Sequence, residues 1–277
     1  MASSPYPVAS FAFTCHPIIG KRRAPMVTGF SSRGPNAVVP ELLKPDVISP
    51  GLNILAAWTG SGDDIPLYKK NHNYRFPLYD VNRSPARRRH RSADQEEATS
   101  WTPAMIHSAL MTTARMLDNM ERDILDDGFR VATPFAAGAG HVHPQLVMDP
   151  GLVYDIGARN YVDFLCALNY TAQQLQQFTP DVAACMSTAL PGGPTNLNYS
   201  TFVMIFSGQT NVYTLTRTMT KVSQNAEMYN VTVVAPELAK VTVTPTTLKF
   251  KKQNKKKSYI DVNRFESSSL VVIEYHL

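Results

Sequence analysis

Three side chains in the middle of the chain have the types that bind metals or carry protons. His141 and His143 are separated by one residue, and Asp149 follows shortly after them. On an extended strand alternate side chains point to the same side, so the two imidazoles would share one face. Imidazole and carboxylate groups are common ligands of transition metals. These residues are therefore one candidate metal site, to be weighed against a structural role.

A second candidate is the adjacent pair His107 and Ser108, because a nucleophilic serine needs a base within hydrogen-bond distance. The pair lies in a pattern that predicts a helix. Thr102 suits the N-cap, Pro103 suits the first helical position, and apolar residues recur at helical spacing from Met105. Adjacent residues on a helix do not face each other. We therefore predict that His107 and Ser108 do not act as base and nucleophile.

The chain has three cysteines, Cys15, Cys166 and Cys185, and lacks the Cys-x-x-Cys spacing of zinc sites. Cys166 and Cys185 are candidates for a disulfide in an oxidising compartment. No run of about 18 apolar residues is present, so no membrane span is expected. The first residues have no basic region before an apolar stretch and do not resemble a signal peptide.

The elements that would position these residues change along the chain. Residues 1–58 are predicted to form short strands interrupted by Gly and Pro, at 26–30, 44–48 and 53–57. Residues 59–100 lose apolar periodicity, become rich in arginine and are predicted to be disordered. Further helices are predicted at 161–168 and 171–175.

After residue 190 the apolar period changes to two, which predicts a β-sandwich. The expected strands are 202–206, 212–219, 228–234, 241–245 and 248–250.

Several motifs occur in the order in which plant subtilisin-like serine proteases (subtilases) carry them, outside residues 59–100. They are FSSRGPN at 30–36, LKPDVISPGLNILAAW at 43–58, SALMTTA at 108–114, ATPF at 132–135, GAGHV at 138–142, DPGLVYD at 149–155, NLNYSTF at 196–202 and RTMT at 217–220. The chain thus resembles the C-terminal part of a subtilase, with the nucleophile segment disrupted.

The resemblance implies a partial α/β subtilisin-like domain followed by an all-β fibronectin-III-like sandwich. The first would occupy residues 1–190, and the second residues 191–277, with a departure from the family pattern from Asp261 onward. The resemblance also makes His141 part of a structural motif, so no metal and no cofactor are predicted.

The chemistry of the family requires a serine nucleophile, a histidine base, an orienting aspartate and an oxyanion donor. The resemblance places the Asp, the His and the oxyanion Asn upstream of residue 1. The serine segment should precede Trp101, and its slot falls near Val81, where the motif is missing. No catalytic residue is therefore predicted in this chain, and the chain as written is predicted to be inactive.

The arginine-rich segment has a specific explanation at the level of codons. Read one base later, the codons allowed for 85–97 permit PHVAGIAALIRKK, which resembles the family sequence after the nucleophile. When the shifted reading is continued upstream of Pro85, it does not give the family's residues at Tyr79, Asn82 and Ser84. We hypothesise that residues from near 60 to 100 are a frame-shifted reading of the nucleophile segment. A polar replacement cannot fill a buried slot, so residues 1–150 are predicted to fold poorly alone.

The net charge of +5 is concentrated at 83–91 and 251–257. Such clusters can bind nucleic acid, but no stacking aromatics interleave the arginine run, so nucleic acid is disfavoured as a partner. The lysine run is expected to flank a strand turn. The main prediction is a fragment of a serine endopeptidase that would act on proteins or peptides if completed upstream. The alternatives are a non-catalytic protein-binding module on the sandwich and, less favoured, a basic nucleic-acid binder.

Of the four Asn-x-Ser/Thr sequons, those at Asn169, Asn198 and Asn230 are candidate glycosylation sites and suit a secreted ancestor, whereas the one at Asn82 lies in the aberrant segment and is set aside. The resemblance also implies an extracellular, apoplastic location and a homodimer, as in some subtilases.

Overall fold

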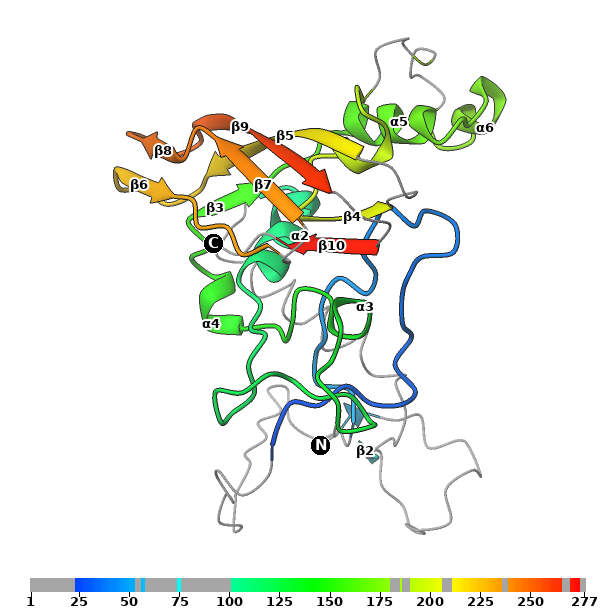
Figure 1. The fold of residues 1–277 in the computed structure, drawn as a ribbon, viewed down its shortest axis with the longest axis vertical. Helices are drawn as coiled ribbons and strands as arrows, with labels where there is room; N and C mark the ends of the chain where they lie inside the picture. Colours follow the sequence, from blue (N-terminus) through cyan, green and yellow to red (C-terminus); the bar gives the residue numbers. More distant parts are fainter. Residues whose placement is uncertain are drawn as a thin grey trace, which may run out of the picture.

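The computed structural model describes residues 23–52, 56–57, 74–75, 101–179, 185, 190–205, 211–235, 239–265 and 270–274. Two predictions, disorder across 59–100 and the nucleophile slot near Val81, lie outside the described residues. The exception is Tyr74–Arg75 (β2), which pairs antiparallel with Ala56–Ala57 (β1). Figure 1 shows a strand-rich layer at one end of the molecule and long connecting loops at the other.

The strands predicted at 26–30 and 44–48 are wrong, because the structure forms single bridges there. Met26 bridges to Leu125, and Ile48 bridges to His141. Turn residues follow the first bridge, and Pro45 and Pro50 flank the second. Proline cannot donate to a β-ladder, so pairing does not extend beyond one residue.

The helix predicted after Trp101 is confirmed as α2, Pro103–Thr112. The Thr102 side chain accepts a hydrogen bond from the Met105 amide at 3.1 Å and caps it. Most of α2 is buried, and it packs in one core with Val47, Val147 and Val153. Figure 1 shows α2 beneath the sheet, so it is a central support rather than a surface helix.

The other predicted helices are confirmed as α5, Ala158–Ala167, and α6, Ala172–Gln176. The Thr171 hydroxyl accepts from the Gln174 amide, and the Gln174 side chain accepts from the Thr171 amide, so α6 begins with a capping box. The other helices in the described ranges are one turn each: α3, Pro134–Ala137, α4, Pro144–Val147, and the 3-10 helix η2, Pro194–Asn196.

Backbone conformation and close packing explain the two glycines in the sequence GAGH after α3. Gly138 and Gly140 both have positive φ, at 60° and 109°. A Cβ at Gly140 would collide with the Arg115 carbonyl, and one at Gly138 would collide with the backbone of Pro45 and Asp46. Only glycine allows these backbone segments to approach so closely. The motif therefore has a structural role, because it lets this loop pack closely against the segment around Asp46.

The β-sandwich predicted after residue 190 is present. Its four-stranded antiparallel sheet has the order β3-β5-β9-β7, and two further pairs, β4–β10 and β6–β8, complete it. In Figure 1 β5, β9 and β7 form the upper layer and β4 and β10 lie beneath. The strands are β3 Leu152–Tyr154, β4 Thr201–Ile205, β5 Asn211–Lys221, β6 Glu227–Asn230, β7 Ala239–Thr244, β8 Thr247–Phe250, β9 Lys256–Phe265 and β10 Leu270–Glu274.

Three strands of the sandwich were not predicted: β3, which precedes residue 190, and β9 and β10. The inner face of β9 presents Tyr259, Asp261 and Asn263, all buried, and its partner β5 places Leu215 opposite Asp261. An apolar pattern could not reveal this strand, because two of the three inward residues are polar. The amide of Asn263 has no hydrogen-bond partner at either end.

The sheet is shared by the two parts of the chain. Strand β3 precedes residue 190, yet it pairs with β5, with Leu152 opposite Lys221 and Tyr154 opposite Met219. Leu152 and Tyr154 belong to the same core as Phe250 of β8. The boundary near residue 190 stays a prediction, and β3 ties the segment before it to the sandwich.

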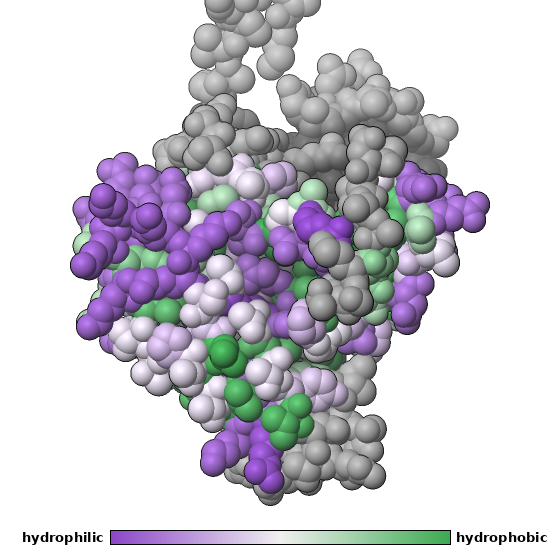
Figure 2. All heavy atoms as spheres, turned by 90° about the horizontal axis from the view of Figure 1, so that it is seen from above, coloured by the Kyte–Doolittle hydropathy of each residue, from purple (hydrophilic) through white to green (hydrophobic). Residues whose placement is uncertain are grey.

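The surface over the sheet is mainly hydrophilic, with small groups of hydrophobic side chains (Figure 2). The lysine run at 251–257 is exposed and lies at the turn from β8 into β9, as predicted.

Candidate functional site

The side chains of His107 and Ser108 serve different neighbours. The buried Ser108 Oγ accepts a hydrogen bond from the Tyr154 amide at 2.8 Å. The His107 Nε2 atom lies 3.2 Å from an Asp46 carboxylate oxygen. The pair therefore forms no nucleophile and base, as predicted.

Asp46 is the centre of a buried polar cluster. Its carboxylate receives the Lys44 ammonium at 2.6 Å and the Tyr199 hydroxyl at 2.9 Å, in addition to His107. Burial alone would raise the pKa of Asp46. The hydrogen bond with His107 and the charges of Lys44 and His107 outweigh burial and hold this pKa well below its ordinary value. The cluster joins a loop, α2 and the entry to the sandwich.

The two histidines of the candidate metal site make local backbone contacts. His141 Nδ1 lies 2.9 Å from the Val142 carbonyl, and His143 Nδ1 accepts from the Leu146 amide at the start of α4. Among the residues that the structure describes, no group of three His, Cys, Asp or Glu side chains is placed to hold a metal ion. His141, His143 and Asp149 are not brought together as a ligand set.

The three candidate glycosylation sites differ in accessibility. Asn169 and Asn230 are exposed, whereas Asn198 is half-buried. The Asn198 Nδ2 atom donates to the carbonyls of Asp155 and Thr218, and its Oδ1 atom accepts from the Thr218 amide. Asn198 therefore bridges two backbone segments and offers no free amide for a glycan in the folded chain.

Cys166 and Cys185 form a disulfide in the structure, with Cα atoms 5.6 Å apart. The spacing lies in the ordinary range for such bonds. Cys166 stands on α5, so the bond ties this helix to the chain that follows α6.

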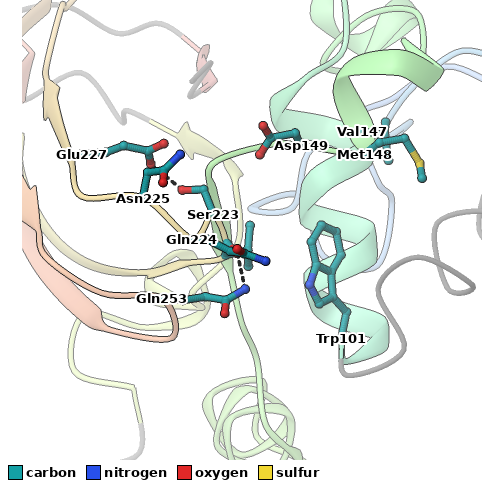
Figure 3. Close-up of a pocket in the computed structure, with 10 residues that line it drawn as sticks. Trp101, Val147, Met148, Asp149, Ser223, Gln224, Asn225, Glu227 and Gln253 are labelled. Carbon is teal, nitrogen blue, oxygen red and sulfur yellow. Dashed lines mark hydrogen bonds between the residues drawn. The ribbon is translucent and has the colours of Figure 1, made fainter.

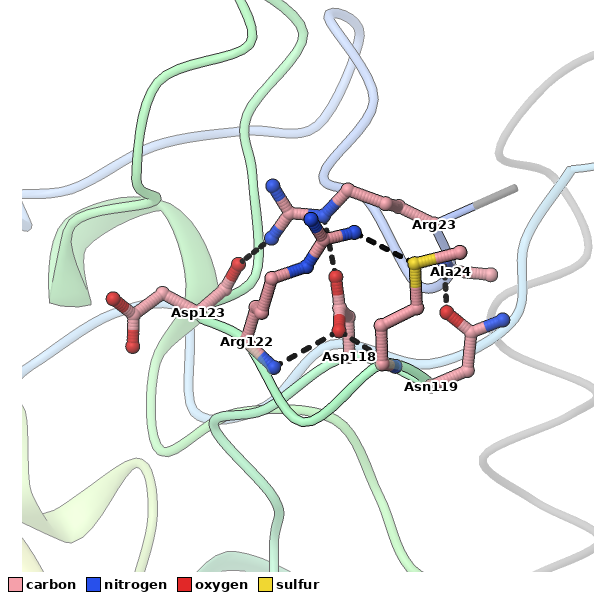
Figure 4. Close-up of polar contacts among 7 residues, drawn as sticks. Arg23, Ala24, Asp118, Asn119, Arg122 and Asp123 are labelled. Atoms are coloured by element: carbon pink, nitrogen blue, oxygen red, sulfur yellow. Dashed lines mark hydrogen bonds and ion pairs between the residues drawn. The ribbon is translucent and has the colours of Figure 1, made fainter. Parts of the chain in front are cut away.

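A group of polar contacts, called the polar staple here, joins residues 23–24 to the turn at 118–123 (Figure 4). Asp118 accepts hydrogen bonds from the amides of Met120 and Arg122, and from the Arg23 side chain at 2.5 Å. Burial acts to raise the pKa of Asp118, but these hydrogen bonds outweigh it and lower that pKa. Asn119 accepts from the Ala24 amide at 3.0 Å, so the staple fixes the segment at residues 23–24.

A cavity of about 410 Å³ opens between the end of α4 and the sandwich (Figure 3). One side of the cavity is formed by Trp101 and residues 147–149. The other side is formed by the 222–227 turn and Gln253. Its lining is Trp101, Val147, Met148, Asp149, Val222, Ser223, Gln224, Asn225, Glu227 and Gln253. Gln253 donates to the Val222 carbonyl at 2.6 Å, which fixes the β8–β9 turn against this wall.

Comparison with known proteins shows two kinds of similarity. Residues 196–270 match the fibronectin type-III domain family. Subtilisin-like protease SBT1.3 of Arabidopsis thaliana is 40% identical over 252 residues, which is 87% of this chain and 32% of that protein. The chain is related to the plant subtilisin-like proteases.

Other subtilisin-like proteases match over similar lengths. SBT1.6 of Arabidopsis thaliana is 37% identical over 93% of the chain and 34% of its own length. SBT3 of Solanum lycopersicum is 34% identical over 91% of the chain and 34% of its own length. The chain spans about a third of the length of these proteases. None of the helices in the described part of the chain is long and apolar enough to cross a membrane.

Sequence reasoning did not find the Asp46 cluster or the cavity. Asp46 and Tyr199 are 153 positions apart, and the cavity combines four separate segments. The motifs around 43–58 and 196–202 contain Asp46 and Tyr199 and were the available signal, but their contact is a tertiary fact.

Proposed function

We propose that this chain is the C-terminal part of a plant subtilase, a serine endopeptidase of protein and peptide substrates. The observation that carries the proposal is the ordered match to subtilisin-like proteases across 87% of the chain or more. The fibronectin type-III match at 196–270 supports the same placement within such a protein.

In a completed enzyme of this kind, a serine would attack the scissile carbonyl, a histidine would take its proton, and an oxyanion donor would stabilise the tetrahedral intermediate. The family pattern puts these groups outside the motifs that this chain retains. Ser108 and His107 do not replace them, because Ser108 is buried against the Tyr154 amide and His107 is engaged with Asp46. We therefore propose that the chain as written has no protease activity.

An activity-based probe tests this proposal directly. A fluorophosphonate labels a serine only where the serine is activated as a nucleophile. We expect no labelling of the purified chain, with an intact plant subtilisin-like protease labelled in parallel. Labelling that disappears after heat denaturation would contradict the silent assignment while leaving the family relationship intact.

The frame-shift hypothesis is proposed as the origin of residues 60–100. Sequencing the transcript across codons 55–105 tests it. A reading frame that encodes Pro-His-Val-Ala-Gly there would support a disrupted nucleophile segment. Codons that, read one base later, do not encode this sequence would reject the hypothesis and leave a non-catalytic protein.

The extracellular location, glycosylation and homodimer are proposed on the same relationship. The Cys166–Cys185 bond supports an oxidising compartment. Secretion of the intact precursor and its mass in solution would test the location and the dimer separately.

A protein-binding module is the second candidate, and it is favoured by the cores that lie within the sandwich. Phe202 and Met204 of β4 pack against Leu215 of β5, which gives the layers an apolar interior of their own. This candidate can be tested by a pull-down that compares the proteins bound by the parent chain with those bound by a variant substituted on the exposed face of the sandwich. The arginine run needed for a nucleic-acid binder lies outside the described residues.

A further inference from the structure

The cavity beside α4 has a charge pattern of its own. Two acidic residues, Asp149 and Glu227, line it, and no Lys, Arg or His lies among its lining residues. The other polar side-chain groups are one hydroxyl, three amides and the indole N–H of Trp101. A site of this composition attracts a cation or a donor-rich group rather than an anion.

The charge of Glu227 is already balanced by the protein. Its Oε2 atom accepts hydrogen bonds from Ser223 and from Tyr229, the latter at 2.5 Å, and the Lys221 ammonium lies 3.3 Å away. The hydrogen bonds from Ser223, Tyr229 and Lys221 lower the pKa of Glu227, although burial opposes them. Glu227 is therefore ionised and paired with the fully buried Lys221.

Asp149 has no such partner. It is exposed, and its carboxylate makes no hydrogen bond or ion pair with any other residue in the described ranges. In Figure 3 this carboxylate points toward the Asn225 and Glu227 side of the cavity. The cavity thus carries one negative charge that the chain leaves unbalanced.

An aromatic wall and several acceptors complete the site. The half-buried indole of Trp101 stands across the cavity from Gln253 and Gln224 (Figure 3). Indole faces attract cations, and planar cations also stack on them. The amide oxygens of Gln224 and Asn225, both exposed, can accept further hydrogen bonds.

We propose that this cavity binds the guanidinium group of an arginine side chain, presented by a peptide or protein segment. A guanidinium carries one positive charge, which matches Asp149, and five N–H donors, which match the carboxylate and amide acceptors. Its plane suits the Trp101 face better than a compact ammonium does. The proposal is independent of the lost protease chemistry, because it uses only residues of the described chain.

Titration with N-acetyl-arginine amide, followed by nitrogen–proton NMR of the whole chain, tests the site. The chain has two tryptophans, so the Trp101 indole signal can be assigned with a Trp58→Phe variant. We expect a saturable shift of this signal, a much smaller shift with the lysine analogue, and none with the neutral N-acetyl-citrulline amide at equal concentration.

Two isosteric variants give matched controls. Asp149→Asn should weaken arginine binding about tenfold or more, since it removes the unbalanced charge. Asp123→Asn changes net charge equally at an exposed position that does not line the cavity, and it should leave binding unchanged. Both variants alter exposed side chains, so folding is retained and can be checked in the same spectra.

Three results would overturn the proposal. They are no shift of the Trp101 signal, equal shifts with citrulline and arginine, or unchanged arginine binding in Asp149→Asn. A saturable shift with methyl glucoside and none with arginine would reassign the cavity to neutral hydroxyl-rich ligands.

Discussion

Replacement of Asp46 by Asn tests whether the polar cluster joins the two parts of the chain. Asp46→Asn keeps the side-chain volume and removes the charge. The carboxylate is buried and has three partners, Lys44 at 2.6 Å, Tyr199 at 2.9 Å and His107 at 3.2 Å. We expect the free energy of unfolding to fall, because Lys44 and His107 lose their anionic partner.

The magnitude follows from burial. Removal of one partner from a buried, hydrogen-bonded charge pair costs about 3–5 kcal/mol. The Lys44 side chain is 38% exposed, so water replaces part of its lost pairing. The Tyr199 hydroxyl can still donate to the new amide oxygen. These two compensations reduce the expected cost to about 2–3 kcal/mol near neutral pH.

The pH dependence gives the sharper signature. The folded-state pKa of Asp46 lies below the unfolded value of 3.8. A depressed pKa contributes stability that is present above the unfolded value and is lost as pH falls through 3.8 toward the folded pKa. The cost of Asp46→Asn should therefore shrink in acid.

Urea unfolding of both proteins at about pH 7 and about pH 3, followed by tryptophan fluorescence, measures the difference. Asp123→Asn is the matched control, because its side chain is exposed. A cost below about 1 kcal/mol at both pH values, or an equal cost at both, would refute the reasoning.

Three further results are expected. Asn263→Leu should raise the free energy of unfolding by about 1–3 kcal/mol in thermal melts, because the buried amide has no partner at either end; a lower melting temperature would contradict this. Cys166→Ser should cost about 3 kcal/mol, since the bond to Cys185 closes a 19-residue separation, and reductant should abolish the difference between variant and parent. After expression in a secretory host, peptide mapping should find glycan at the exposed Asn230 and none at Asn198; an occupied Asn198 in folded protein would be inconsistent with its backbone bonds.

Local chemistry made the helices predictable. Thr102 with Pro103, and Thr171 with Gln174, are cap signals that act within one turn, and both helices begin where these signals stand. The strands of the sandwich with alternating apolar residues were predictable for a similar reason. Strand β9 was not, because its inward Asp261 and Asn263 break the apolar pattern while the ladder to β5 is still formed.

The candidate sites depended on contacts that sequence spacing does not contain. The cavity brings Trp101 and Asp149 against the 222–227 turn and Gln253. The Asp46 cluster depends on Tyr199, which lies in a distant motif. The ordered motifs predicted the ancestry, since order along a chain survives without any knowledge of contacts, but they could not predict which side chains meet.

The place of β9 in the sheet also sets the order in which the sandwich can be built during synthesis. β9 lies between β5 and β7, and neither of these pairs with the other. While residues 211–255 leave the ribosome, β5 and β7 are without the strand that joins them. The sheet can close only after Phe265 has emerged, so its open edges stay available for wrong pairing during that interval.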